Sequence, residues 1–355
     1  MAQQHLDPPT DSAAGTAPRA APAPLDEGGA PIGDALAGYL RSQATEFLRS
    51  LRQHRETGAA ASGAGESGDA ARSLRRSARR ISGSLHTFRP LLDADWSEGM
   101  RPELAWLSGT LAREHAYAAR LERLLGALNR LSGTAVLPAQ AGRAPAPKGN
   151  LTIGAAKAGA LLDRQLTLAR TRAHSAALQA LGSSRFHAVA DSVAVLASEV
   201  PLTPSADSAD LRPLAAAARD RLTDAVTALP LVTAGHPYNA EALVHGLSAD
   251  TAPQPQDAPW HQVRLLLRLH RYAREVLHHG ECPVDVRLLG AGQALNRHRD
   301  AAEAAAAAAS AARTPRIAPA TAYALGVLHA DQRHEVEAAR FAFQQTWQKE
   351  AVRIP

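Results

Sequence analysis

Two segments far apart in the chain each combine an apolar helical face with a face made almost wholly of arginine and histidine. The first segment, residues 72–80, reads RSLRRSARR, and the second, residues 261–272, reads HQVRLLLRLHRY. Because an α-helix turns by about 100° per residue, positions three, four and seven apart share one side. The basic residues on that side are Arg72, Arg75, Arg76 and Arg79 in the first segment and His261, Arg264, Arg268 and Arg271 in the second. Each segment is therefore predicted to be a helix that packs one face on a core and presents a cationic stripe.

The apolar positions of these two helices follow the same spacing. They are Leu74, Ala78, Ile81, Leu85 and Phe88 in the first and Val263, Leu266, Leu267, Ala273 and Leu277 in the second. Similar periodicity predicts helices over residues 33–56, 68–90, 97–132, 152–182, 184–199, 209–229, 257–279, 284–313 and 318–349. No run alternates apolar and polar residues with β-branched or aromatic enrichment, so strands are not expected. The sequence predicts an all-α protein.

The helices fall into two series. Residues 1–31 are rich in Pro, Ala and Gly without periodicity, which is typical of a disordered tail outside the fold. A Pro-containing break at residues 201–208 then separates residues 32–202 from residues 203–355. Each series has about four long helices, one of them basic, and 45% of the chain is hydrophobic, enough to bury a large core or two. We expect two four-helix bundles related by an internal repeat.

The charge of the chain is concentrated locally. Its 355 residues carry 39 Lys and Arg against 34 Asp and Glu, so the net charge is only +5, yet the pI is about 9.8 because nearly all the bases are arginine. Residues 72–80 contain no acidic residue, so their arginines repel one another unless an anion or another helix compensates them. Arginine binds phosphate oxygens with charge-assisted hydrogen bonds, without a catalytic base or a metal. These features predict a basic groove for a polyanion.

Other patterns that could carry chemistry are weak. Residues 278–282, HHGEC, include ligand types that zinc uses, but adjacent histidines point apart and no second half-site follows. Residues 290–292 lack the strand and the third glycine of a dinucleotide-binding loop. We therefore expect no metal and no cofactor. A single cysteine, no leader pattern and no apolar run of about 18 residues favour a cytoplasmic protein without a membrane partner.

The second basic segment resembles the signature of the CHAD family, the conserved histidine α-helical domain. His261, Arg264, Arg268, Arg271 and Tyr272 fall at the family spacing, and Glu275 follows at the usual interval. Four further segments are similar to the family: residues 87–92, 177–186, 295–300 and 326–347. The first copy departs from the pattern, because Arg72 stands in place of the signature histidine and Ser82 in place of a later arginine.

The resemblance implies two bundles related by a pseudo-two-fold axis around a basic central pore that binds inorganic polyphosphate. On this basis we predict a non-enzymatic binding protein that gathers at polyphosphate granules. The binding residues that we predict are Arg72, Arg75, Arg76, Arg79, Arg80, His261, Arg264, Arg268, Arg271 and Tyr272.

Three alternatives stay open at this point. A nucleic-acid-binding protein would use the same phosphate contacts, although only 4% of the residues are aromatic and no rings alternate with the arginines to stack on bases. A polyphosphate-processing enzyme would need carboxylates for magnesium near the stripes, where Asp257 and Asp300 are the candidates. The third alternative is a scaffold whose altered first stripe has lost its ligand.

Overall fold

The computed structural model describes residues 32–59, 64–133, 150–236, 247, 254–280 and 283–348, and within these ranges the chain forms helices and no strand. The predicted all-α class is therefore confirmed. The predicted tail, residues 1–31, lies outside the described residues. All the helices belong to one compact unit, Pro31–Pro355.

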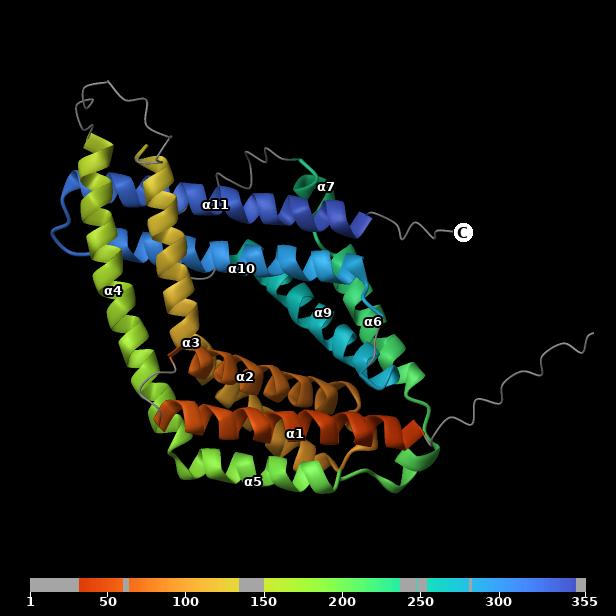
Figure 1. The fold of residues 1–355 in the computed structure, drawn as a ribbon. Coiled ribbons are helices and arrows are strands. Elements are labelled where there is room, and N and C mark those ends of the chain that lie inside the picture. The colour runs from red at the N-terminus through yellow and green to blue at the C-terminus, as the bar shows by residue number, and fades with distance from the viewer. Residues whose placement is uncertain are drawn as a thin grey trace, which may run out of the picture. The chain divides into compact units, whose positions relative to one another are not determined.

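The α-helices are α1 (Ile32–Ala59), α2 (Ala64–Thr87), α3 (Ala94–Leu131), α4 (Asn150–Leu181), α5 (Ser184–Ser198), α6 (Arg212–Thr227), α7 (Leu231–Ala234), α9 (Ala258–Leu277), α10 (Val286–Ala312) and α11 (Pro319–Gln348) (Figure 1). Three short 3-10 helices are η1 (Arg89–Leu91), η2 (Pro204–Ser208) and η3 (Pro255–Asp257). Each helix predicted from periodicity is present, with ends that differ by a few residues. The short elements were not predicted, because a single turn carries no measurable period.

Side-chain caps fix where several helices begin. The carboxylates of Asp93 and Asp285 accept hydrogen bonds from the backbone N–H groups of Trp96 (2.8 Å) and Leu288 (3.0 Å), which starts α3 and α10. The hydroxyl of Ser183 does the same for α5. Such caps satisfy backbone donors that have no partner inside the helix.

Three clusters of buried apolar side chains hold the helices together. The first joins α1, α2, α5 and the start of α3 with part of α6 and the end of α9. The second lies among α6, α9, the first half of α10 and the end of α11. The third joins the end of α3 and the first half of α4 with the end of α10 and the start of α11. The first and third clusters contain residues from both sides of residue 202, so the division into bundles 32–202 and 203–355 stays a prediction.

The two basic helices, α2 and α9, pack as their sequences indicate. Every apolar position assigned to their core-facing sides is buried, except Leu277, which is half-buried. Leu74, Ala78 and Ile81 of α2 share the first cluster with Ala273 of α9, and the two helices touch. Because both helices have their apolar sides in the core, their arginines are left to face the space beside it.

Candidate functional site

A cavity of about 460 Å³ lies among α2, α3, α9 and α10. Six arginines line it, and we name it the arginine cavity: Arg75, Arg79, Arg101, Arg264, Arg268 and Arg299. Its other lining residues are small, apolar or polar ones, among them Ser82, His86 and Tyr272. The packing of α2 beside α9 thus brings both cationic stripes to one space, although the stripes are far apart in the sequence.

Four of these arginines carry a polar atom that nothing in the described structure satisfies. The Nε atoms of Arg75, Arg79, Arg264 and Arg268 are buried and have no hydrogen-bond partner. Arg264 makes one bond elsewhere, from its Nη1 to Oδ1 of Asn296 at 3.3 Å. Buried polar groups in native proteins nearly always have a partner. These four Nε atoms therefore lack the partner that such groups ordinarily have.

The remaining two arginines of the cavity each have an acidic neighbour. Arg299 donates from Nε to Oδ1 of the adjacent Asp300 at 2.8 Å. Arg101 donates from Nη1 to Oε1 of Glu98 at 3.4 Å. Asp300, Asp257 and Glu98 do not themselves line the cavity, and none of the described lining residues is an Asp or a Glu. The cavity thus has excess positive charge.

The arginines of the cavity disfavour one another's charged forms. Burial, and then the charges of Arg79 and Arg299, lower the pKa of Arg75 to about 10. Burial, and then Arg268 and Arg299, lower the pKa of Arg264 to about 9. Burial also lowers the pKa of Arg79 and of Arg268. All four remain charged at neutral pH, so an anion in the cavity would relieve both the burial penalty and the mutual repulsion.

Arg80 and Arg271, also predicted to bind the ligand, line a different pocket of about 380 Å³. Arg80 is already compensated there, because its Nε and Nη2 donate to the two carboxylate oxygens of Glu275 on α9, at 2.7 and 3.3 Å. The hydroxyl of Tyr39 donates to the same carboxylate at 2.7 Å. Although burial acts in the opposite direction, the hydrogen bond to Glu275 raises the pKa of Arg80. A second helix, rather than a ligand, neutralises this arginine.

Arg72 and Arg76 lie farther out on α2, and both are exposed. Arg72 forms an ion pair with Asp69, which lies one turn earlier in the same helix and just outside the segment without acids. Neither Arg72 nor Arg76 lines the arginine cavity. Of the first stripe, Arg75 and Arg79 are the members that face it.

His261 is half-buried and does not line the arginine cavity. Its ring meets the ring of His298 edge-on, with centroids 5.4 Å apart. The pKa of His261 is lowered, mainly by burial. The charge of Asp257 acts to raise this pKa, while the charge of Arg264 lowers it. The structure thus places this residue, which we expected to contact the ligand, beside a buried ionic cluster.

That buried cluster centres on Asp257, which is 3% exposed. Arg333 donates to its two carboxylate oxygens at 2.8 and 3.2 Å, and Arg340 donates to Oδ1 at 2.6 Å. A second bond from Arg340 reaches Glu337 at 2.7 Å. Burial alone would raise the pKa of Asp257, but its contacts with His298 and Arg333 hold that pKa far below its usual range. Asp257 is therefore an internal counter-ion that fixes the start of α9 to α11, and its side chain does not cap the helix.

Arg101, Arg299 and His86 line the cavity but were not among the predicted site residues. Arg299 lies in the segment 295–300 that resembles the family, which was a usable signal. The sequence contains no comparable signal for Arg101 and His86, because only tertiary packing brings α3 and the end of α2 to the cavity.

The described residues form neither a metal-binding cluster nor a membrane-spanning helix. No group of three or more His, Cys, Asp and Glu side chains in this part of the chain could hold a metal ion. None of its helices is both long and apolar enough to cross a membrane. Glu281 and Cys282, considered above as zinc ligand types, lie outside the described residues.

Comparison with known proteins gives the family. The CHAD domain profile matches residues 42–308. The solved structure of PptA from Streptomyces chartreusis is 74% identical to this chain and has a TM-score of 0.76. The match covers 90% of this chain and 100% of the PptA chain. The CHAD domain from the plant Ricinus communis is 18% identical and has a TM-score of 0.49. This match covers 92% of our chain and 97% of the Ricinus chain. No curated protein matches. Because the matched range contains both basic helices and most of the sequence, the chain belongs to the CHAD domain family.

Proposed function

We propose that this protein binds inorganic polyphosphate in the arginine cavity and does not catalyse a reaction on it. The observation that carries the proposal is the set of four buried guanidinium Nε atoms without acceptors, two from α2 and two from α9. Phosphate oxygens are well-matched acceptors for guanidinium groups, because charge-assisted bonds between them are short and strong. A polymer with a negative charge on each phosphate would satisfy several arginines at once.

The arrangement of the arginines supports a chain-like ligand over a single small ion. Arg75 and Arg79 stand one turn apart on α2, and Arg264 and Arg268 stand one turn apart on α9. Both pairs line the same cavity of about 460 Å³. We propose that α2 and α9 are the counterparts in two bundles related by a pseudo-two-fold axis, with the cavity as the basic pore between them.

Binding without catalysis is the function that the acidic residues favour. Magnesium-assisted phosphoryl transfer uses carboxylates to hold the ion next to the phosphates. Of the two candidate acids, Asp257 is bound by Arg333 and Arg340, and Asp300 is bound by Arg299. We therefore propose binding without catalysis. As expected from the sequence, we further propose that the protein is cytoplasmic and gathers where polyphosphate accumulates, in polyphosphate granules.

Equilibrium binding over a salt series tests the proposal. Long-chain polyphosphate, single-stranded RNA and duplex DNA are compared at matched phosphate concentration with the wild-type protein and with Arg264→Gln/Arg268→Gln. Arg212→Gln/Arg219→Gln is the matched control, because both arginines are exposed on α6. We expect polyphosphate to bind most tightly and the α9 variant alone to lose affinity. RNA or DNA binding as tightly as polyphosphate would instead identify a nucleic-acid-binding protein.

A further inference from the structure

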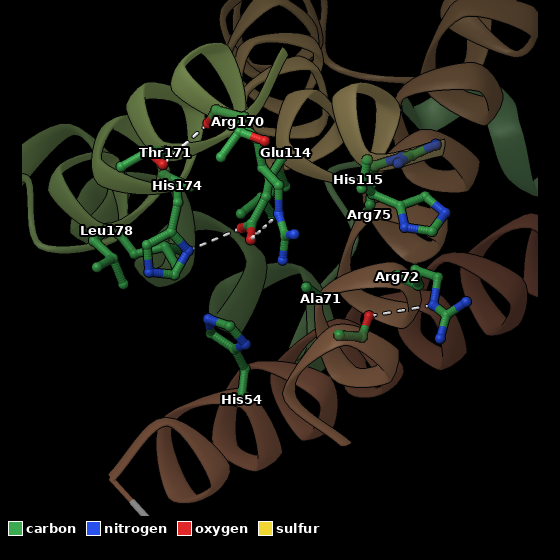
Figure 2. Close-up of a pocket in the computed structure, with 16 residues that line it drawn as sticks. His54, Ala71, Arg72, Arg75, Glu114, His115, Arg170, Thr171, His174 and Leu178 are labelled. Atoms are coloured by element: carbon green, nitrogen blue, oxygen red, sulfur yellow. Dashed lines mark hydrogen bonds and ion pairs between the residues drawn. The ribbon is translucent and has the colours of Figure 1, made fainter. Parts of the chain in front are cut away.

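A second cavity, of about 660 Å³, opens among α1, α2, α3 and α4 (Figure 2). Its titratable lining side chains are His54 of α1, Arg72 and Arg75 of α2, Glu114 and His115 of α3, and Arg170 and His174 of α4. The presence of three histidines distinguishes it from the arginine cavity, whose lining contains one, His86. We name it the histidine pocket.

Arg75 lines both cavities. Its buried Nε atom has no hydrogen-bond partner. Figure 2 shows Arg75 and His115 on one side of the histidine pocket, with His54 and His174 toward the other. Arg75 thus belongs to the walls of both cavities, which adjoin at this residue.

The charged groups of the histidine pocket are only partly compensated. Glu114 is engaged by His174, whose Nδ1 lies 2.9 Å from Oε2, and by Arg170, whose Nε lies 3.8 Å from Oε1. Arg72 pairs with Asp69 of its own helix. Counted with Asp69, three arginines face two carboxylates, which leaves one net positive charge before any histidine binds a proton.

We propose that the histidine pocket binds a further stretch of the same polyphosphate chain and that its contribution grows as the pH falls, so that long chains are held more tightly in acid. The inference rests on the proposed function and extends it to chain length and pH. Histidine is the side chain whose charge ordinarily changes near pH 6.5. Bound phosphate favours the charged imidazolium form, while the neighbouring arginines oppose it.

The arginine cavity responds much less to the same change of pH. Its arginines stay charged across this range, and burial, then Arg101 and Arg221, lower the pKa of its single histidine, His86. For a short anion that the arginine cavity holds by itself, this cavity should therefore supply little or no gain in affinity in acid, whereas a long chain should gain from the histidine pocket. This difference separates the two sites experimentally.

The test uses the full chain with tripolyphosphate and with long-chain polyphosphate, at about pH 7.5 and about pH 5.5 and at fixed ionic strength. His115→Gln/His174→Gln removes two histidines that are exposed, so the core is untouched. His187→Gln on α5 is the matched control, since His187 is exposed and lines neither cavity. Protonation of the ligand itself is the same for all three proteins and cancels in the comparison.

We expect the wild-type protein and the control to bind long chains more tightly at the lower pH, on the order of tenfold, which is the worth of one charge-assisted contact. The double variant should lose this gain. A gain that persists in the double variant, or that is equal for tripolyphosphate, overturns the inference. Failure of the proposed function looks different, because the Arg264→Gln/Arg268→Gln variant would then bind polyphosphate as the wild-type protein does at both pH values.

Discussion

Gly83 of α2 lies directly against the ring of Tyr272 of α9: a methyl group on Gly83 would come 2.6 Å from Cδ2 of that ring. Such a separation is far below van der Waals contact. The missing side chain lets α2 approach α9 closely, beside Arg79 and Arg268, which line the cavity from opposite helices. A residue without any charge thus sets the spacing of the two stripes.

Replacing Gly83 by alanine should destabilise the protein by about 1–3 kcal/mol, the usual cost of overpacking a filled contact. It should also weaken polyphosphate binding, because the Tyr272 ring must move within the cavity wall. Urea unfolding and a binding titration measure the two effects. Gly99→Ala on α3 is the control, since nothing lies within 4 Å of the added methyl group there. Equal stability of the two variants would show that α2 and α9 can separate freely.

Replacing either arginine pair by glutamine should weaken polyphosphate binding by roughly 1.5–3 kcal/mol for each arginine removed. The pairs are Arg75 with Arg79 and Arg264 with Arg268. Affinity should also depend less steeply on salt, because fewer counterions are released on binding. Circular dichroism should be unchanged, since glutamine is a good helix former. If only the α9 pair matters, the ligand is held by one helix and not between two.

Asp257→Asn should destabilise the protein by about 3–5 kcal/mol, because it leaves Arg333 and Arg340 as buried charges with a weaker partner. Asp300→Asn is the comparison variant, since the ion pair of Asp300 with Arg299 is only half-buried. An ion pair that keeps its contact with water is worth about 0–1 kcal/mol. Denaturant unfolding distinguishes the two. A mild effect at Asp257 would mean that water enters the cluster and solvates the arginines.

Stability should fall as the pH drops from about 6.5 toward 4. Burial lowers the pKa of His298 to about 4, so the folded protein keeps it neutral where the unfolded chain, with an ordinary pKa near 6.5, binds a proton. Stability therefore falls by about 3 kcal/mol as the pH drops from about 6.5 to about 4, and this loss is complete below that window. Asp257 adds a further loss below about pH 4, because its folded pKa is depressed.

Unfolding free energies of wild-type protein and of His298→Gln, measured across the same window, check the sign. The variant should show a flatter profile between about pH 6.5 and 4, since it lacks the histidine whose lowered pKa produces this part of the slope. Identical slopes in the two proteins would assign the acid sensitivity to other residues.

Periodicity was enough to predict the fold class and the long helices, because burial of one face leaves a repeated pattern in the sequence. Leu74 and Ile81, for instance, are fully buried at positions that spacing alone identified. The short elements α7, η1, η2 and η3 carry no such repeat. The loop contact between Leu92 and Leu202, a single antiparallel bridge, also has no local signal.

The site was only partly predictable, because charge compensation is a tertiary property. The segment 72–80 contains no acid, yet Arg80 is neutralised by Glu275 from a helix far away in the chain. His261 fits the helical stripe by spacing, yet it packs beside His298. Arg299 was missed because its helix, α10, has no marked basic face. Which arginines remain without a counter-ion can be determined only once the helices are packed.

The position of α9 in two cores has a consequence for how a bound polymer would affect the protein. Trp260 and Val263 of α9 pack in the second cluster, while Ala273 and Val276 pack in the first. If a polyanion binds between α2 and α9 as proposed, it would link segments that are distant along the chain and would favour the folded state by mass action. Resistance to proteolysis would then increase with the concentration of polyphosphate, and the protein would be degraded faster when polyphosphate is scarce.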